Sequence, residues 1–233
     1  SRQSKGLPIV NVLPVEKDEK ISSIIKLNVE NQEKYLILAT KQGLIKRTNL
    51  EEFENIRATG KICIKLKEND ELIGVKKTNG ESNILLASSE GRMNVFDENE
   101  IRVMGRTASG VKGINLGSAK CVSIENVNDD DNIVIVTENG YGKKTLISEY
   151  RKTKRGSKGV KALNNTEKNG KIASMKKVID DSDIMIITNQ GIIIRLPLEQ
   201  VSQFGRVTQG TRLINLKSVQ KVASVSLVQK EKE

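Results

Sequence analysis

The sequence predicts an all-β, propeller-like fold, and three observations lead to this prediction. A nine-residue pattern that ends in glycine occurs four times, at residues 35–43, 83–91, 132–140 and 183–191. A second set of glycines recurs with a similar spacing, at Gly6, Gly60, Gly110, Gly159 and Gly210. Long helical periodicity is not evident anywhere in the 233 residues. A repeat of about 50 residues is typical of blade architectures, in which each repeat forms one small sheet.

The repeats divide the chain into a partial blade at residues 1–34 and four complete, four-stranded blades. The complete blades are expected at residues 35–82, 83–131, 132–182 and 183–233. Gly6 corresponds to the middle of a repeat, so the first half of the partial blade is missing. A half-blade by itself would expose strand edges and apolar surface. We therefore expect the natural chain to continue upstream of Ser1.

The first complete repeat shows how four strands arise. Residues 35–40 form a short apolar run, which is typical of a strand covered on both faces. A glycine turn follows, and residues 44–48 form the return strand. Residues 60–66 alternate polar and apolar, which predicts a half-buried strand, and residues 72–75 form the fourth strand. Helix is expected only as single turns, at residues 51–54 and 198–201.

The composition excludes several kinds of chemistry and favours a polyanionic partner. The chain has 39 Lys and Arg against 29 Asp and Glu, which gives a formal net charge of +10. A domain this basic is expected to bind a polyanion. It has no histidine, which excludes His-based acid–base catalysis, Ser-His-Asp triads and His metal ligands. Three Phe and three Tyr are too few for stacking platforms, so duplex is favoured over single-stranded nucleic acid.

Two further features concern the cellular environment. Cys63 and Cys121 lie in different repeats beside apolar residues, so we expect buried thiols in a reducing cytoplasm, without a disulfide or a metal site. The longest apolar runs are far shorter than a membrane span needs, and no signal-peptide pattern opens the chain. No membrane partner is expected.

Basic residues gather around the two glycines of each repeat, whereas acidic residues fall mainly elsewhere. Around the first glycine are Lys46, Arg47, Arg92, Lys143, Lys144 and Arg195. Around the second glycine are Arg2, Lys5, Arg57, Lys61, Arg106, Lys112, Lys154, Arg155, Lys158, Lys161, Arg206 and Arg212. Charge that recurs at one place in each blade predicts a positive track along the rim, which would bind and bend duplex DNA through its phosphates. The alternative is that these cations solvate strand edges and block aggregation.

The densest group of cations lies at residues 150–159. It comprises Arg151, Lys152, Lys154, Arg155 and Lys158. Glycines in this segment would let backbone N–H groups approach phosphate closely. The alternative is a flexible basic loop without a defined site. Tyr150 is not expected to be a nucleophile, because nothing near it resembles a strand-cleaving site, and no catalytic residue is predicted.

Several stretches resemble one protein family, the C-terminal domain of the A protein of bacterial DNA gyrase, which is a type IIA DNA topoisomerase. They are residues 6–14, 57–66, 70–75, 103–114, 138–145 and 205–210. The resemblance implies a six-bladed β-pinwheel in which neighbouring blades exchange strands. It also implies a basic rim that wraps double-stranded DNA. The wrapped DNA would be presented to the gyrase A N-terminal cleavage domain, within an ATP-dependent A2B2 holoenzyme that contains gyrase B and introduces negative supercoils.

The family's signature box, Gln-Arg-Arg-Gly-Gly-Lys-Gly, is absent from the sequence, and residues 154–159 and 2–6 only echo it. The fragment is therefore not expected to be an enzyme by itself or to carry a cofactor. The resemblance implies a cytoplasmic, nucleoid-associated protein. Three alternatives stay open: the corresponding C-terminal domain of topoisomerase IV, a propeller-like protein-interaction scaffold, and a catalytic propeller, which the lack of histidine disfavours.

Overall fold

Each repeat opens with a β-hairpin, as the sequence predicts. The computed structural model describes residues 7–8, 11–13, 15, 19, 21–25, 33–54, 56, 60–217 and 219–230. In three of the four hairpins the first strand is an apolar run whose central residues are almost completely buried, as Ile37, Leu85 and Ile135 show. The turn glycine has φ near +80° in all four hairpins, a value that glycine adopts without strain.

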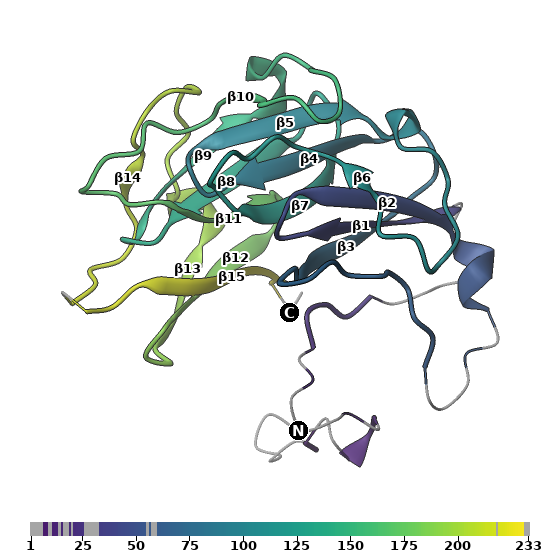
Figure 1. Cartoon of the computed structure of the whole chain (residues 1–233). Coiled ribbons are helices and arrows are strands. Elements are labelled where there is room, and N and C mark those ends of the chain that lie inside the picture. The colour runs from purple at the N-terminus through teal and green to yellow at the C-terminus, as the bar shows by residue number, and fades with distance from the viewer. Residues whose placement is uncertain are drawn as a thin grey trace.

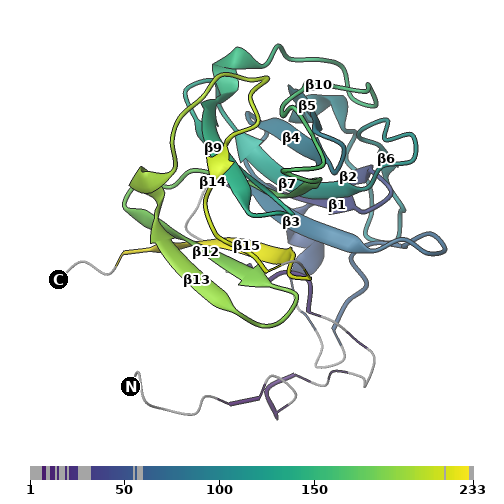
Figure 2. The same cartoon turned by 90° about the vertical axis from the view of Figure 1, so that its left-hand side faces the viewer.

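Four antiparallel sheets follow one another round an arc (Figures 1 and 2). From the inner to the outer strand, the sheets have the orders β3-β1-β2-β6, β7-β4-β5-β10, β11-β8-β9-β14 and β15-β12-β13. The strands are β1 (Tyr35–Thr40), β2 (Leu44–Asn49), β3 (Leu72–Thr78), β4 (Asn83–Ser88), β5 (Arg92–Asp97), β6 (Val111–Lys112), β7 (Cys121–Val127), β8 (Asn132–Thr137), β9 (Tyr141–Leu146), β10 (Val160–Lys161), β11 (Ile172–Lys177), β12 (Ser182–Thr188), β13 (Ile193–Pro197), β14 (Thr211–Arg212) and β15 (Val222–Gln229). The all-β, blade-type prediction is confirmed.

Neighbouring blades exchange strands, as the resemblance implied. The outermost strand of each four-stranded sheet comes from the next repeat: β6 pairs with β2, β10 with β5, and β14 with β9. Each of these strands is only two residues long and follows the second glycine of its repeat. We call β6, β10 and β14 the exchanged strands. Because each is held by one repeat and belongs to another, the blades cannot separate without breaking ladder hydrogen bonds.

The second glycine of each repeat explains how an exchanged strand comes so close to its neighbour. Gly110 precedes β6 and has φ +92°, a backbone conformation that favours glycine. A Cβ atom built on it would lie 2.6 Å from the carbonyl oxygen of Ile45 in the preceding blade. The second glycines Gly110, Gly159 and Gly210 are therefore close-approach positions between blades.

One strand expected from the sequence is not formed. Residues 60–66 are not a strand, and Ile62 is 66 % exposed. These residues occupy the place of an exchanged strand. An exchanged strand pairs with the preceding sheet, and the structure describes no strand before β1. The fourth sheet has three described strands, because no exchanged strand pairs with β13, where Ile193 is 60 % exposed. Most of the partial blade expected at residues 1–34 lies outside the described residues.

Apolar side chains fill the spaces between adjacent sheets. The cluster between the second and third sheets, for example, brings Leu85 and Met93 against Ile133 and Met175. The inner strands also carry a charged row. Glu125 on β7 is almost fully buried and pairs with Lys76 on β3 and, at 3.7 Å, with Lys176 on β11. This row links three blades near the centre of the arc.

Short helices and free cysteines complete the description of the fold. Four single-turn 3-10 helices follow the hairpins, at Leu50–Phe53, Glu98–Glu100, Ile147–Glu149 and Leu198–Gln200. Both cysteines are free, and burial raises the pKa of the Cys121 thiol to about 12. The described part of the chain contains no helix that is long and apolar enough to cross a membrane. Within the same ranges, no three His, Cys, Asp or Glu residues cluster as a metal site would require.

Candidate nucleic-acid interface

Two of the lysines predicted to contact DNA are fully buried, so that prediction is wrong for them. Lys46 and Lys143 occupy the same place, three residues after the turn glycine, in the first and third blades. The Lys143 ammonium donates to the carbonyl oxygens of Gly205 at 2.8 Å and Arg206 at 2.7 Å. Lys46 likewise donates to carbonyl oxygens, those of Cys63 and Arg106. Both lysines thus bind a loop of the next repeat, Lys46 also binds Cys63 of its own repeat, and neither reaches the surface.

Burial has an electrostatic cost for both ammonium groups. Removal from water disfavours the charged form, and it lowers the pKa of Lys143 from 10.5 to about 8. Burial lowers the pKa of Lys46 in the same direction. In the second blade the same place is occupied by Asn94, whose amide donates to the carbonyl oxygens of Gly113 and Lys154. In the second blade an uncharged amide thus donates to the loop carbonyls, and no buried charge has to be desolvated.

Arg47 is also a structural residue, which corrects a third predicted contact. The residue is 7 % exposed, and its guanidinium lies over the Tyr35 ring, 4.7 Å from the ring centre. It donates to the Asn99 amide oxygen at 3.0 Å and lies 3.7 Å from the carboxylate of Glu98. Glu98 is completely buried and accepts hydrogen bonds from Thr78 Oγ1 and two backbone N–H groups. Arg47 therefore compensates a buried carboxylate at the junction of the first two blades.

Three loop arginines at equivalent places hold the neighbouring repeat. Each donates to the carbonyl oxygen of a residue two positions after the second glycine: Arg106 to Ile62, Arg155 to Lys112 and Arg206 to Lys161. Their side chains are half-exposed and lie at the surface, but some of their N–H groups donate to backbone carbonyls. These arginines recur in the sequence because they bond adjacent blades. Their recurrence is therefore not specific evidence of a ligand-binding site.

Four other predicted residues are engaged within the protein. Arg92 is exposed but donates to two backbone carbonyls of the loop that precedes β10. Arg195 pairs with Asp183 at 2.6 Å, and Lys152 pairs with Asp129 at 3.1 Å. Lys61 donates to backbone carbonyls of the first 3-10 turn region. Because Arg195 and Lys152 are paired with carboxylates, these two are weaker candidates for phosphate contact.

The exchanged strands place one exposed cation on the outer side of each of three blades. Lys112, Lys161 and Arg212 are the second residues of β6, β10 and β14, which are edge strands of the first three sheets. We call these three residues the rim cations. All three are exposed, and none forms an ion pair with another described residue. The structure thus brings together a row of outward cations that belong to three successive repeats.

Further cations lie at the surface. Arg151, Lys154 and Lys158 are exposed, and their charged groups form no hydrogen bond within the described chain; Lys144 is half-exposed. Arg102, which was not predicted, is exposed as well. Its spacing was the available signal, since it lies four residues before Arg106 as Arg151 lies four before Arg155. The predicted contacts Arg2, Lys5 and Arg57 lie outside the described residues.

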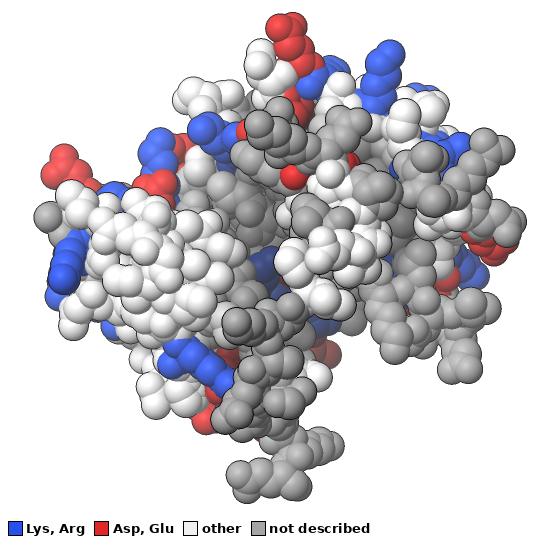
Figure 3. Space-filling model, turned by 90° about the horizontal axis from the view of Figure 1, so that it is seen from below, with Lys and Arg blue, Asp and Glu red and all other residues white. Residues whose placement is uncertain are grey.

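The face seen from below contrasts with the rim. Figure 3 shows that most described residues on this face are uncharged, and that Lys, Arg, Asp and Glu gather mainly toward its edge. The chain is a strand-exchanging, blade-type β domain that carries an exposed cation on each exchanged strand.

Comparison with known proteins identifies the family. The family model described as "DNA gyrase C-terminal domain, beta-propeller" matches residues 1–28, 34–79, 82–128, 131–179 and 182–229. The chain belongs to this family. The DNA gyrase A protein of Staphylococcus epidermidis is 45 % identical over 99 % of the chain and 26 % of that protein, and the Staphylococcus aureus protein is 44 % identical over 100 % and 27 %. The chain thus spans about a quarter of these relatives.

Solved structures agree with the fold. A crystal structure of the C-terminal domain of DNA topoisomerase IV superposes with a TM-score of 0.87 at 28 % identity, covering 96 % of this chain and 71 % of that one. A DNA gyrase A C-terminal domain superposes with a TM-score of 0.84 at 24 % identity, covering 97 % and 76 %. One structure comes from topoisomerase IV and the other from DNA gyrase, the two enzymes that the sequence left as alternatives.

Proposed function

We propose that this chain binds duplex DNA along its rim cations, without reading base sequence, and bends it. The carrying observation is the row formed by Lys112, Lys161 and Arg212, which are exposed, outward and free of ion pairs within the described chain. Lysine and arginine side chains without carboxylate partners are available for phosphate oxygens. A row on successive blades would follow a curved path, so bound DNA would have to bend.

Membership of the gyrase family supports a role for this DNA binding within a parent enzyme. In a DNA gyrase A protein the bent DNA would be delivered to the N-terminal cleavage domain, and the holoenzyme with gyrase B would supply ATP-dependent supercoiling. Cleavage and ATP hydrolysis would then belong to other parts of the complex, and this chain would act without a catalytic residue or a cofactor of its own. A bacterial, cytoplasmic and nucleoid-associated location follows from this proposal.

The topoisomerase IV alternative has one observation in its favour, the structural match to the topoisomerase IV domain at 28 % identity. The sequence relatives favour gyrase, since they are 44–45 % identical over essentially the whole chain. A supercoiling assay on the complete parent enzyme separates the two proposals. Introduction of negative supercoils into relaxed DNA supports gyrase, whereas relaxation and decatenation without supercoiling support topoisomerase IV.

The rim is tested by a triple substitution, Lys112→Ala, Lys161→Ala and Arg212→Ala. If each residue contacts one phosphate, the slope of log K against log salt becomes shallower by about 0.9 per residue, or nearly 3 in total. The matched control, Lys41→Ala, Lys171→Ala and Lys230→Ala, removes the same charge from cations that are ion-paired to carboxylates. Affinity is measured by fluorescence anisotropy with two unrelated duplexes.

The design separates the proposal from its rivals. Equal salt slopes for the rim variant and the control would refute the rim as the binding site. A complex that is insensitive to salt would support a protein-interaction scaffold instead. Bending is measured on the wild-type chain by energy transfer between dyes at the two ends of a short duplex, and unchanged transfer on saturation would refute it.

A further inference from the structure

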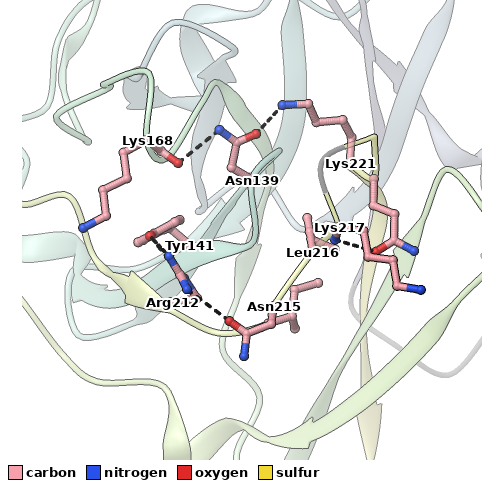
Figure 4. A pocket seen from close by; sticks show the side chains of 10 residues that line it. Asn139, Tyr141, Lys168, Arg212, Asn215, Leu216, Lys217 and Lys221 are labelled. Carbon is pink, nitrogen blue, oxygen red and sulfur yellow. Dashed lines mark hydrogen bonds between the residues drawn. The ribbon is translucent and has the colours of Figure 1, made fainter.

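A cationic pocket lies where the third and fourth blades meet. It is lined by residues from β9, from β14 and from the loops that precede β11 and β15, and its volume is about 290 Å³. Four of the described lining residues are cationic and none is acidic. The cations are Lys168, Arg212, Lys217 and Lys221. Figure 4 shows the labelled side chains arranged round an open centre.

The guanidinium of Arg212 is fixed in the pocket wall. Its Nε and Nη2 atoms donate to the hydroxyl oxygen of Tyr141 at 3.2 and 2.9 Å, and Nη1 donates to Asn215 Oδ1 at 3.2 Å. A guanidinium has five N–H donors. Two of them thus remain for a ligand, and they belong to a group whose orientation is set by neutral partners. No carboxylate of the described chain neutralises this arginine.

The three lysines surround the fixed group as movable cations. Lys168 lies 5.6 Å from the centre of the Tyr141 ring, and Lys221 donates to the side-chain oxygen of Asn139. Lys217 has no side-chain bond within the described chain. A lysine ammonium on its flexible stem can turn toward an anion that enters between these groups. One planar, oriented arginine with mobile lysines is a donor set that suits phosphate oxygens.

The equivalent place one blade earlier shows why this pocket differs. There Lys171 corresponds to Lys221, and Glu90 corresponds to Asn139. The pair Lys171–Glu90 is an ion pair of 2.7 Å. At the third junction an amide replaces the carboxylate, so the positive charge is left without an internal counter-ion. A second pocket, which is lined by the ion-paired Lys77 and Glu33, likewise lacks this excess of positive charge.

We propose that this pocket is a binding site for a phosphate group. Arg212 supplies two oriented N–H donors, and the lysines supply charge that adapts to the phosphate. The group is either a backbone phosphate of DNA on the adjacent rim or a phosphate carried by a small molecule. The site does not depend on the rim as a whole, because only Arg212 belongs to both.

The experiment is a ¹H–¹⁵N NMR titration of the chain with inorganic phosphate at constant ionic strength balanced with chloride. We expect saturable shifts confined to the amides that line the pocket. Substitution of Lys217→Gln with Lys221→Gln is expected to weaken binding about tenfold. The control Lys65→Gln with Lys67→Gln removes the same charge from exposed lysines of the first repeat and leaves binding unchanged.

Tyr141→Phe tests the positioning of the arginine without removing charge. Loss of the hydroxyl frees the guanidinium from its orienting acceptor, and we expect about threefold weaker phosphate binding with unchanged thermal stability within a degree or two. Shifts spread over all exposed lysines, or equal affinity in the pocket and control variants, would overturn the proposal.

A second arm identifies the source of the phosphate. A short duplex is added to the phosphate-saturated chain. Displacement of phosphate from the pocket identifies a DNA backbone phosphate as the source, whereas binding of the duplex without displacement excludes DNA and leaves a phosphorylated small molecule as the source. Both outcomes retain the pocket. If phosphate binds while the duplex does not bind at all, the pocket stands and the proposed DNA-binding function fails.

Discussion

Substitution of Lys143→Met tests whether Lys143, which the sequence predicts to contact DNA, instead stabilises the fold. Methionine has a similar length but cannot donate to the carbonyl oxygens of Gly205 and Arg206. Hydrogen bonds from charged donors contribute about 1.5–3 kcal/mol each, so two lost bonds cost about 5 kcal/mol. Part of this is offset, because burial costs the ammonium about 3 kcal/mol, given a pKa lowered from 10.5 to about 8 at 1.36 kcal/mol per pH unit.

The net loss is therefore about 2 kcal/mol, or roughly 4–8 °C in melting temperature for a domain of this size. The assay is thermal unfolding at pH 7, with the neighbouring Lys144→Met as the control, since Lys144 is half-exposed and uses only its backbone in the described contacts. DNA affinity of folded Lys143→Met is expected to stay within about threefold of wild type. A variant of unchanged stability that loses DNA binding would refute the structural role.

The same residue predicts a pH dependence of stability. The folded-state pKa of Lys143 is about 8 and the ordinary value is 10.5, so between these values the unfolded chain binds more protons. The free energy of unfolding therefore rises with pH in this window. Lys143→Met lacks this contribution. We expect the stability gap between wild type and variant to widen from pH 8 to pH 10, and a constant gap would contradict the assigned pKa.

Three other substitutions test the contacts between blades. Glu125→Gln removes the charge between two lysines of neighbouring blades and should cost about 1–3 kcal/mol in chemical denaturation; an unchanged midpoint would show that the row contributes nothing. Arg47→Met leaves the buried Glu98 without its cation and should cost about 3 kcal/mol without changing DNA affinity, so a loss of affinity alone would reverse the assignment. Gly110→Ala should cost about 2–4 kcal/mol by melting temperature, because both the strained φ and the overlap with the preceding blade oppose it. Gly60→Ala, with φ +75° and open space around the position, should cost only about 1 kcal/mol, and equal losses would refute the close-approach explanation.

The fold could be predicted from the sequence because its signals are local and repeated. Apolar runs that end in a turn glycine fix the hairpins, and four copies fix the blade architecture. The partner of an exchanged strand is not a local property, so the alternation at residues 60–66 predicts a strand although the structure describes no sheet to receive it. Periodicity alone therefore predicts strands and leaves their pairing open.

The site was predicted less well, for a physical reason. A lysine three residues after a turn glycine looks the same in the sequence whether it points out or in. Lys46 and Lys143 point inward because loop carbonyls of the next repeat lie above them and need donors. Lys112 and Arg212 point outward because exchanged strands lie at the edge of the sheet. Both groups are basic, and only the fold separates them.

Strand exchange couples the binding surface to the integrity of the blade junctions. Lys112 belongs to the second repeat but is carried on the sheet of the first, and Gly110 fixes the approach of that strand to Ile45. A rim cation can therefore keep its place only while both repeats stay docked. DNA bent along the rim would pull on successive blades together, and the hydrogen bonds of the exchanged strands would oppose that load. Gly110→Ala should consequently weaken DNA binding although Gly110 carries no charge, whereas Gly60→Ala should leave binding unchanged.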